Sequence, residues 1–180
     1  MPPAPAFLFQ PPASFWPFRW VEETGDEQYR RALYTFHRRS TPYPALQVFD
    51  QPNGLASCAR RWRSNSPLQA LTALNEPIFV ECARLLARKT IEEGGKTDSE
   101  RLRYAFRRAV AKMPSDAELA ELNALLVTQQ IRIDCGELNP NAIVGALPAN
   151  ASPELTPSRW ASYTIVARVL LNLDETITKE

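Results

Sequence analysis

The chain has 180 residues, a net charge of +1 and a hydrophobic fraction of 44%. This length and composition suit one globular domain with a packed core. The near-neutral charge lacks the broad basic field that nucleic-acid binding requires, so we expect no nucleic-acid partner. The most apolar run, residues 165–173, is too short for a membrane span and contains Arg168 and Asn172. We therefore expect no membrane span.

Metal and cofactor sites are not indicated by the sequence. The chain contains one histidine, His37, and three cysteines, Cys58, Cys82 and Cys135, which are far apart in sequence. Zinc-type Cys-His spacing, a CxxCH haem attachment motif and a glycine-rich phosphate loop are all missing from the sequence. We predict no metal and no cofactor. Cys82 is interpreted as a buried apolar residue, and one disulfide between two of the three cysteines remains an alternative.

Residues 1–22 are rich in proline and aromatic residues. Proline fixes φ and removes backbone donors, which argues against a helix or a central strand. We predict an extended arm that lies on the domain, followed by a single helical domain at residues 23–180. A proline-rich ligand for an aromatic groove is the alternative.

Residues 26–39 predict the first helix. Acidic residues lead this segment and basic residues end it, as the helix dipole favours, and Tyr29, Leu33 and Phe36 would share one face. Prolines then break the helix. Residues 46–49 are expected to form one short extended segment.

The clearest helix signal begins at Ser66. Ser66 suits an N-cap, Pro67 suits the first helical position, and Gln69 completes a capping box. The sequence Asn75-Glu76-Pro77 either starts a second helix or kinks the first one. Apolar residues recur at spacings of three and four and predict a core seam. Its members are Leu68, Leu71, Leu74, Ile78, Cys82, Leu85 and Leu86.

Further capping boxes open two more predicted helices, at Thr97 with Glu100 and at Ser115 with Glu118. Thr156-Pro157 starts a last helix that is apolar nearly all round, which is typical of a helix buried in a core. These patterns predict an all-α fold, an irregular bundle of five or six helices with a proline-rich extended N-terminal arm.

Catalytic groups are sparse in the sequence. A Ser-His-Asp or Cys-His site would have to use His37, which lies in a basic and aromatic segment that favours a surface or packed histidine. Asp174 and Glu175 are neighbours, and adjacent helical residues point about 100° apart, which does not aim two carboxylates at one bond. The sequence favours a protein that is not an enzyme.

The candidate binding patch precedes the Ser66 cap. Arg60, Arg61 and Arg63 surround Trp62, and Asn65 follows them. Forked guanidinium donors in such a patch can hold phosphate, sulfate or carboxylate groups, or a protein partner. The simpler interpretation is that the arginines pair internally and lie over aromatic rings.

Four stretches, in one order along the chain, carry a family resemblance. They read YRRALYTFHRRSTPYPALQVFD, RRWRSNSPLQALTALNEPIFVECARLLA, DSERLRYAFRRAVAKMPSDAEL and VARVLLNLDETITKE. Together they resemble the planctomycete-specific, cytochrome-c-associated domain of unknown function, over residues 7–180. That domain forms the C-terminal part of large proteins, whose longer members carry an exported N-terminus and often a c-type haem domain.

The resemblance implies a C-terminal fragment or a naturally short member of that family, located in the periplasm or at the cell surface. It transfers no catalytic residue. The expected partner is an upstream or separate domain of the same multidomain system, including a c-type haem domain. We therefore expect a non-catalytic interaction or structural module. The alternative is part of an enzyme or binding protein that acts on polysaccharide or another anionic polymer through the Arg/Trp patch.

Overall fold

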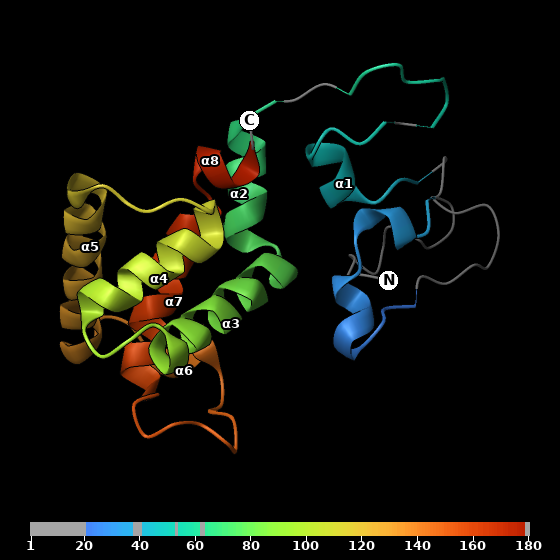
Figure 1. The fold of residues 1–180 in the computed structure, drawn as a ribbon. Coiled ribbons are helices and arrows are strands. Elements are labelled where there is room, and N and C mark those ends of the chain that lie inside the picture. Colours follow the sequence, from blue (N-terminus) through green and yellow to red (C-terminus); the bar gives the residue numbers. More distant parts are fainter. Residues whose placement is uncertain (1–20, 38–40, 53, 62–63, 179–180) are drawn as a thin grey trace. The chain divides into compact units, whose positions relative to one another are not determined.

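The structure is a computed structural model that describes residues 21–37, 41–52, 54–61 and 64–178. These residues form helices and contain no strand, so the predicted all-α fold is confirmed (Figure 1). The chain divides into two compact units. Unit 1 comprises Met1–Thr72 with Glu76–Ile78, and unit 2 comprises Ala73–Asn75 with Phe79–Glu180. The predicted arm, residues 1–22, lies almost entirely outside the described residues.

The described part of unit 1 contains short helical turns instead of the predicted helix over residues 26–39. Two 3₁₀ segments, Gly25–Tyr29 and Ala32–Tyr34, replace it in the described part of this range. Leu33 on the expected apolar face is 79% exposed. A short helix is marginal without packing against a core, because its first turn is costly to nucleate. The prediction of a continuous helix was therefore wrong.

The predicted extended segment at residues 46–49 was also wrong. Helix α1 spans Pro44–Val48, with Pro44 at its first position, where the fixed φ of proline favours a helix. Tyr43 precedes it and is buried, and its hydroxyl donates to the Glu76 carboxylate at 3.1 Å. Burial, reinforced by Glu76, raises the pKa of Tyr43 above its ordinary value.

The capping box at Ser66 is confirmed, and the following break separates two helices. Helix α2 spans Pro67–Asn75 and α3 spans Pro77–Glu93, with the intervening Glu76 in an extended conformation. The predicted leucine seam was wrong in part, since Leu86 packs against the core of unit 2 but other members do not. Leu68, Leu71 and Leu85 are exposed and Cys82 is half-buried, whereas the buried face of α3 consists of Ala83, Ala87, Thr90 and Ile91.

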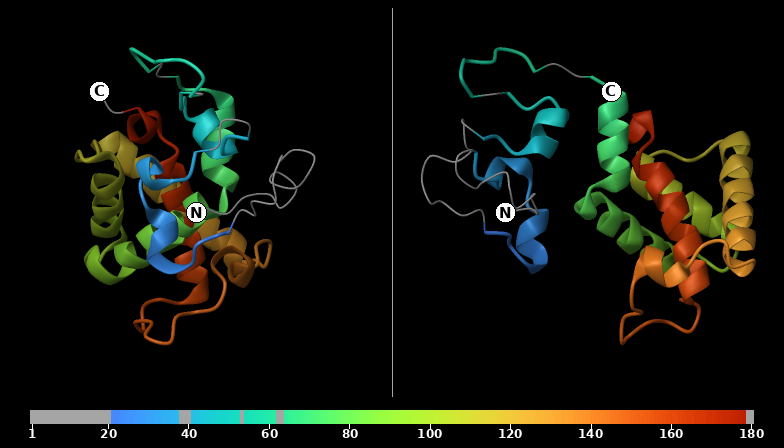
Figure 2. Two further views of the ribbon diagram at one scale, coloured as in Figure 1. Left: turned by 90° about the vertical axis from the view of Figure 1, so that its right-hand side faces the viewer. Right: turned by 180° about the vertical axis from the view of Figure 1, so that it is seen from behind.

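Unit 2 holds the remaining helices, which Figure 2 shows from two further sides. They are α4 (Asp98–Val110), α5 (Asp116–Asp134), α6 (Pro140–Val144), α7 (Pro157–Leu171) and α8 (Asp174–Ile177). Helix α7 contacts α4, α5, α6 and α8, and it is buried on most of its circumference. The prediction of a core helix after Thr156 is confirmed, as are the capping boxes of α4 and α5.

Polar contacts tie α3 to this core. The Trp160 indole on α7 donates to the Arg84 carbonyl at 2.9 Å, and the Arg84 Nε donates to the Ile143 carbonyl at 2.7 Å. The end of α3 also approaches α4 closely. A Cβ atom added at Gly94 would lie 3.0 Å from the Cα of Arg101, so only glycine fits there without a shift.

The N-cap of α5 gives a first testable prediction. The Ser115 hydroxyl accepts from the Glu118 amide, so Ser115→Ala should lower the free energy of unfolding by about 1 kcal/mol. Urea unfolding followed by helical circular dichroism measures this change. Ser99→Ala, at an exposed position inside the first turn of α4, is the control and should change little. Equal losses in the two variants would contradict the capping role.

Candidate functional site

The structure places three of the five predicted patch residues. Arg60, Arg61 and Asn65 are exposed, in the segment of unit 1 that precedes α2, whereas Trp62 and Arg63 lie outside the described residues. The Arg61 side chain reaches back to the end of α1, where it donates from Nε to the Asp50 carbonyl at 3.4 Å and from Nη2 to the Phe49 carbonyl at 3.3 Å. This arginine therefore has an internal anchoring role.

Asp50 is the centre of the contacts around this patch. Its carboxylate accepts from the Ser64 amide at 2.9 Å and from the Ser64 hydroxyl at 2.8 Å. These two hydrogen bonds are the main reason that the pKa of Asp50 lies below its ordinary value. Asp50 also has a φ of 58°, in the left-handed region that aspartate tolerates better than most residues. The carboxylate thus joins the turn after α1 to the segment before α2.

Gln69, in the first turn of α2, contacts the same group of residues. Its side chain is almost fully buried, and its Oε1 accepts from the Ser66 amide at 3.0 Å in the capping box. Its Nε2 donates to the Val48 carbonyl at 2.9 Å and to the Ser64 hydroxyl at 3.1 Å. The capping partner was predictable from the spacing, but the contact with Val48, 21 residues away, was not.

Removal of the Gln69 side chain should open the start of α2. Gln69→Ala loses the capping box and leaves the Val48 carbonyl without this donor, so we expect a local loss of about 2 kcal/mol. Hydrogen exchange of the amides in the first two turns of α2 measures the loss. Leu68→Ala, at a neighbouring exposed position, should stay within about 0.5 kcal/mol. Similar exchange in the two variants would show that the cluster does not stabilise this segment.

The other predicted candidates for chemistry are engaged in simple contacts. The Nδ1 atom of His37 lies 3.0 Å from the Gln51 Nε2, and Glu175 pairs with Lys112 at 2.5 Å. Cys58, Cys82 and Cys135 are free thiols. Cys82 is half-buried, and burial, with a smaller contribution from Glu81, raises the pKa of its thiol. These contacts do not form a nucleophile–base pair.

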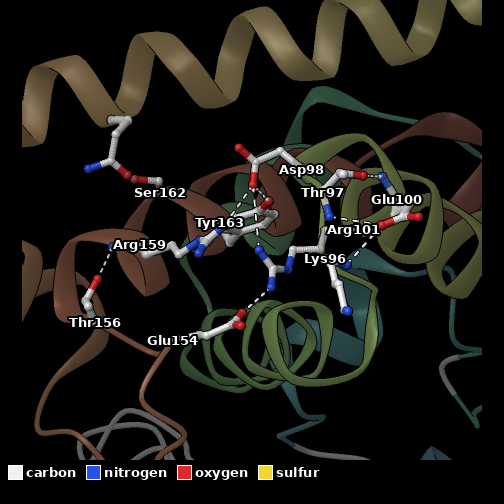
Figure 3. A network of polar contacts seen from close by, with 11 residues as sticks. Lys96, Thr97, Asp98, Glu100, Arg101, Glu154, Thr156, Arg159, Ser162 and Tyr163 are labelled. Carbon is white, nitrogen blue, oxygen red and sulfur yellow. Dashed lines mark hydrogen bonds and ion pairs between the residues drawn. The ribbon is translucent and has the colours of Figure 1, made fainter.

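A second polar cluster lies in unit 2, between the first turns of α4 and α7 (Figure 3). The Asp98 carboxylate accepts from Arg159 at 2.9 Å and from the Tyr163 hydroxyl at 2.8 Å. Arg101, one turn after Asp98, is 2% exposed and pairs with Glu154 in the loop before α7. We call these five residues the Asp98 network. Sequence reasoning missed it, although Arg101 on the apolar side of α4, next to Leu102, was a possible signal.

Asp98 keeps its charge in this setting. Burial alone would raise its pKa, but the hydrogen bonds from Tyr163 and Arg159 outweigh burial and leave the pKa below the ordinary value. Burial, followed by the hydrogen bond to Asp98, raises the pKa of Tyr163. At neutral pH the ionised Asp98 carboxylate and the neutral Tyr163 phenol therefore lie beside the guanidinium groups of Arg101 and Arg159 in this network.

The Asp98 network makes a pH-dependent contribution to stability. A carboxyl with a lowered folded-state pKa stabilises the fold above its unfolded-state pKa, and this stabilisation is lost as the pH falls through the folded-state value. Asp98→Asn should cost about 1 kcal/mol at pH 7, because about half of the Asp98 side chain is exposed and its pairs are screened by solvent. The difference from wild type should shrink between about pH 5 and pH 3.

Urea midpoints of the two proteins at several pH values measure this difference. Asn123→Gln, at an exposed neutral position on α5, is the control and should differ from wild type by the same small amount at every pH. A constant difference between wild type and Asp98→Asn down to pH 3 would contradict the ionic contribution.

Two features are missing from the described residues. Within them, groups of three or more His, Cys, Asp or Glu side chains suited to a metal ion are not found. Across the same part of the chain, the helices are too short or too polar to cross a membrane.

A family model matches residues 3–126 of the chain. It describes PSD1, a protein family of unknown function (DUF1553). The chain belongs to the PSD1 family. No curated protein and no solved structure matches the chain. The PSD1 match includes the candidate patch at Arg60–Asn65 and the Asp50–Gln69 contacts, whereas α7 lies beyond it.

A contact of Arg168 adds to those that connect the PSD1-matched segment to α7. Arg168 on α7 donates from Nη2 to the carbonyl of Leu74, near the C-terminal end of α2. Guanidinium groups stabilise such carbonyls, which lack partners within their own helix. Leu74 belongs to the stretch SNSPLQALTALNEP and Arg168 to VARVLLNLDE, which are two of the stretches that carried the resemblance. Residues that are 94 positions apart thus meet in unit 2.

Proposed function

We propose that this PSD1 chain is a non-catalytic interaction module whose partner binds unit 1. The observation that carries the proposal is the small amount of apolar burial among the described residues of that unit. Among its described residues, the buried ones are Thr41, Tyr43 and Gln69, and only Tyr43 is aromatic or aliphatic. Val21, Leu33 and Leu68 are all more than half exposed. Folded segments normally gain their stability by burying such side chains.

The internal use of polar groups supports a structural role for the motif before α2. The Arg61 guanidinium, the Asp50 carboxylate and the Gln69 amide all bond within the chain. Such contacts order the backbone of unit 1 and leave its exposed apolar residues as the groups that a partner would cover. Exposed apolar patches on soluble proteins commonly mark protein contacts.

The resemblance described above supports the identity of the partner. We propose an adjoining or separate domain of the same extracytoplasmic multidomain system, including a c-type haem domain, in planctomycetes. A folded protein surface of this kind would bury Leu33 and its neighbours by the hydrophobic effect.

A site-specific photo-cross-linker tests this proposal. Incorporation at Leu33 should cross-link the chain to a protein that carries covalent haem, which the Soret absorbance of the purified product would identify. Incorporation at Met113, an exposed apolar residue of unit 2, is the control. Cross-linking that is equal at both positions, or that gives only products without haem, would argue against the proposed partner.

A further inference from the structure

Helix α5 has two apolar faces, of which the core uses one. Leu122, Leu126 and Ile133 are buried in unit 2. On the other side, five exposed apolar residues follow one another along the helix. They are Ala117, Ala120, Ala124, Val127 and Ile131, which we call the outer stripe. Val127 and Ile131 are 50% and 56% exposed.

The spacing of the outer stripe matches a helix–helix seam. Its residues are separated by three, four, three and four positions. This alternation is the a/d pattern with which two helices interlock side chains along a shared seam. Helix α5 has 19 residues and is therefore about 28 Å long. The pattern thus covers about four turns of a continuous helix.

We propose that the outer stripe binds the outer stripe of a second copy of this chain, with the two α5 helices antiparallel about a twofold axis. The sizes of the side chains favour this arrangement. The stripe changes from alanine near its start to valine and isoleucine near its end. Antiparallel pairing sets Ala120 opposite Ile131 and Ala124 opposite Val127. Large side chains then face small ones, as good packing requires.

Charge complementarity favours the same arrangement. Glu121 and Arg132 each directly follow a stripe residue, and positions eleven apart on a helix lie nearly on one line, so both flank the same side of the stripe. Antiparallel pairing brings Glu121 of each copy near Arg132 of the other. Parallel pairing would instead place these flanks on opposite sides of the seam, where the two charges do not meet. Arg132 donates from Nε to Glu137 at 3.0 Å and from Nη1 to Gln129 at 3.4 Å, which uses two of its five donors.

The surface that this pairing would bury is small. One face of one helix is smaller than the roughly 800 Å² that each partner buries in a standard stable interface. The dimer is therefore weak and reversible, with a dissociation constant above about 1 μM.

Sedimentation equilibrium of the full chain over a range of concentrations tests the proposal. Reducing conditions are required because Cys58 and Cys135 are exposed. The wild-type protein should show a monomer–dimer equilibrium, and Ala124→Glu at the centre of the stripe should shift it at least tenfold towards monomer. Ser99→Glu adds the same charge at an exposed helical position on α4 and should associate like wild type.

A charge exchange tests the orientation of the two copies. Glu121→Arg and Arg132→Glu should each weaken the dimer, and the double variant should restore it, because each contact joins one position to the other across the axis. Wild-type protein that stays monomeric up to about 1 mM would overturn the proposal. This concentration is about three orders of magnitude above the smallest dissociation constant expected for an interface of this size. Association of Ala124→Glu equal to that of wild type would also overturn it, as would a double variant weaker than both single ones.

Discussion

Arg101→Ala is expected to lower the free energy of unfolding of unit 2 by about 3 kcal/mol, by loss of packing and of an ion pair in which the guanidinium is buried. Arg101 is the largest of the almost fully buried side chains among the described residues. Its truncation removes the partner of Glu154 and leaves a void beside α4. A loss of this size is a large part of the 5–15 kcal/mol that typically stabilises a domain.

The loss should come mainly from the void and less from the stranded carboxylates. Asp98 and Glu154 are each about half exposed, so water can solvate them when Arg101 is absent. Arg101→Met keeps much of the volume and should therefore cost only about 1 kcal/mol. The Arg101 Nε is itself buried without a hydrogen-bond partner in the structure, which is a cost that methionine would relieve.

Urea unfolding of the three proteins, followed by helical circular dichroism, separates these contributions. A similar large loss in the alanine and methionine variants would show that the charge matters more than the volume. Surface substitutions change the free energy of unfolding by less than about 1 kcal/mol. A loss as small as this in Arg101→Ala would show that the contact between Arg101 and the Glu154 loop does not stabilise the core.

Local signals in the sequence predicted the helix starts well. The capping boxes at Ser66, Thr97 and Ser115 each form as their spacing indicated, and α7 begins after Thr156. These features depend on backbone donors and side chains within three residues of one another. Their local geometry can therefore be predicted from the spacing of a few neighbouring residues.

The buried faces were harder to predict, because they depend on neighbours that the sequence does not identify. The apolar periodicity of α3 pointed to its leucines, whereas Ala83 and Ala87 are the residues that pack inside. Alanine lets helices approach closely, and periodicity scores give it little weight. The outer stripe of α5 presents the same problem, since a helix that is apolar on two faces has no single preferred direction.

The polar clusters were beyond prediction for a related reason. Gln69 meets Val48 across 21 positions, and Tyr163 meets Asp98 across 65. Spacing rules predict contacts within one helix or strand. They do not predict which residues far apart in sequence come into contact when the chain folds. The failure of the helix over residues 26–39 follows the same principle, because Leu33 on its expected apolar face is 79% exposed and gains little from burial.

The core of unit 2 gives the largest expected effect. Phe106 on α4 is 2% exposed and belongs to the cluster that contains Leu102, Trp160 and Leu170. Phe106→Ala should lower the free energy of unfolding by about 3–5 kcal/mol, through lost burial and the cavity left behind. For a unit of about 100 residues, this corresponds to a fall in Tm of more than about 12 °C.

Two further variants make the test specific. Phe106→Leu conserves much of the volume and should cost less than about 1.5 kcal/mol, and Val169→Ala, at a partly exposed position on α7, should cost less still. Hydrogen exchange in Phe106→Ala should increase across α4, α5 and α7 together, because these helices share one core and open as one cooperative unit. Faster exchange confined to α4 would mean that the contacts of α7 do not join the helices of unit 2 into one cooperative unit. Helix α5 would then lack the rigid support that the outer stripe needs for a helix–helix seam.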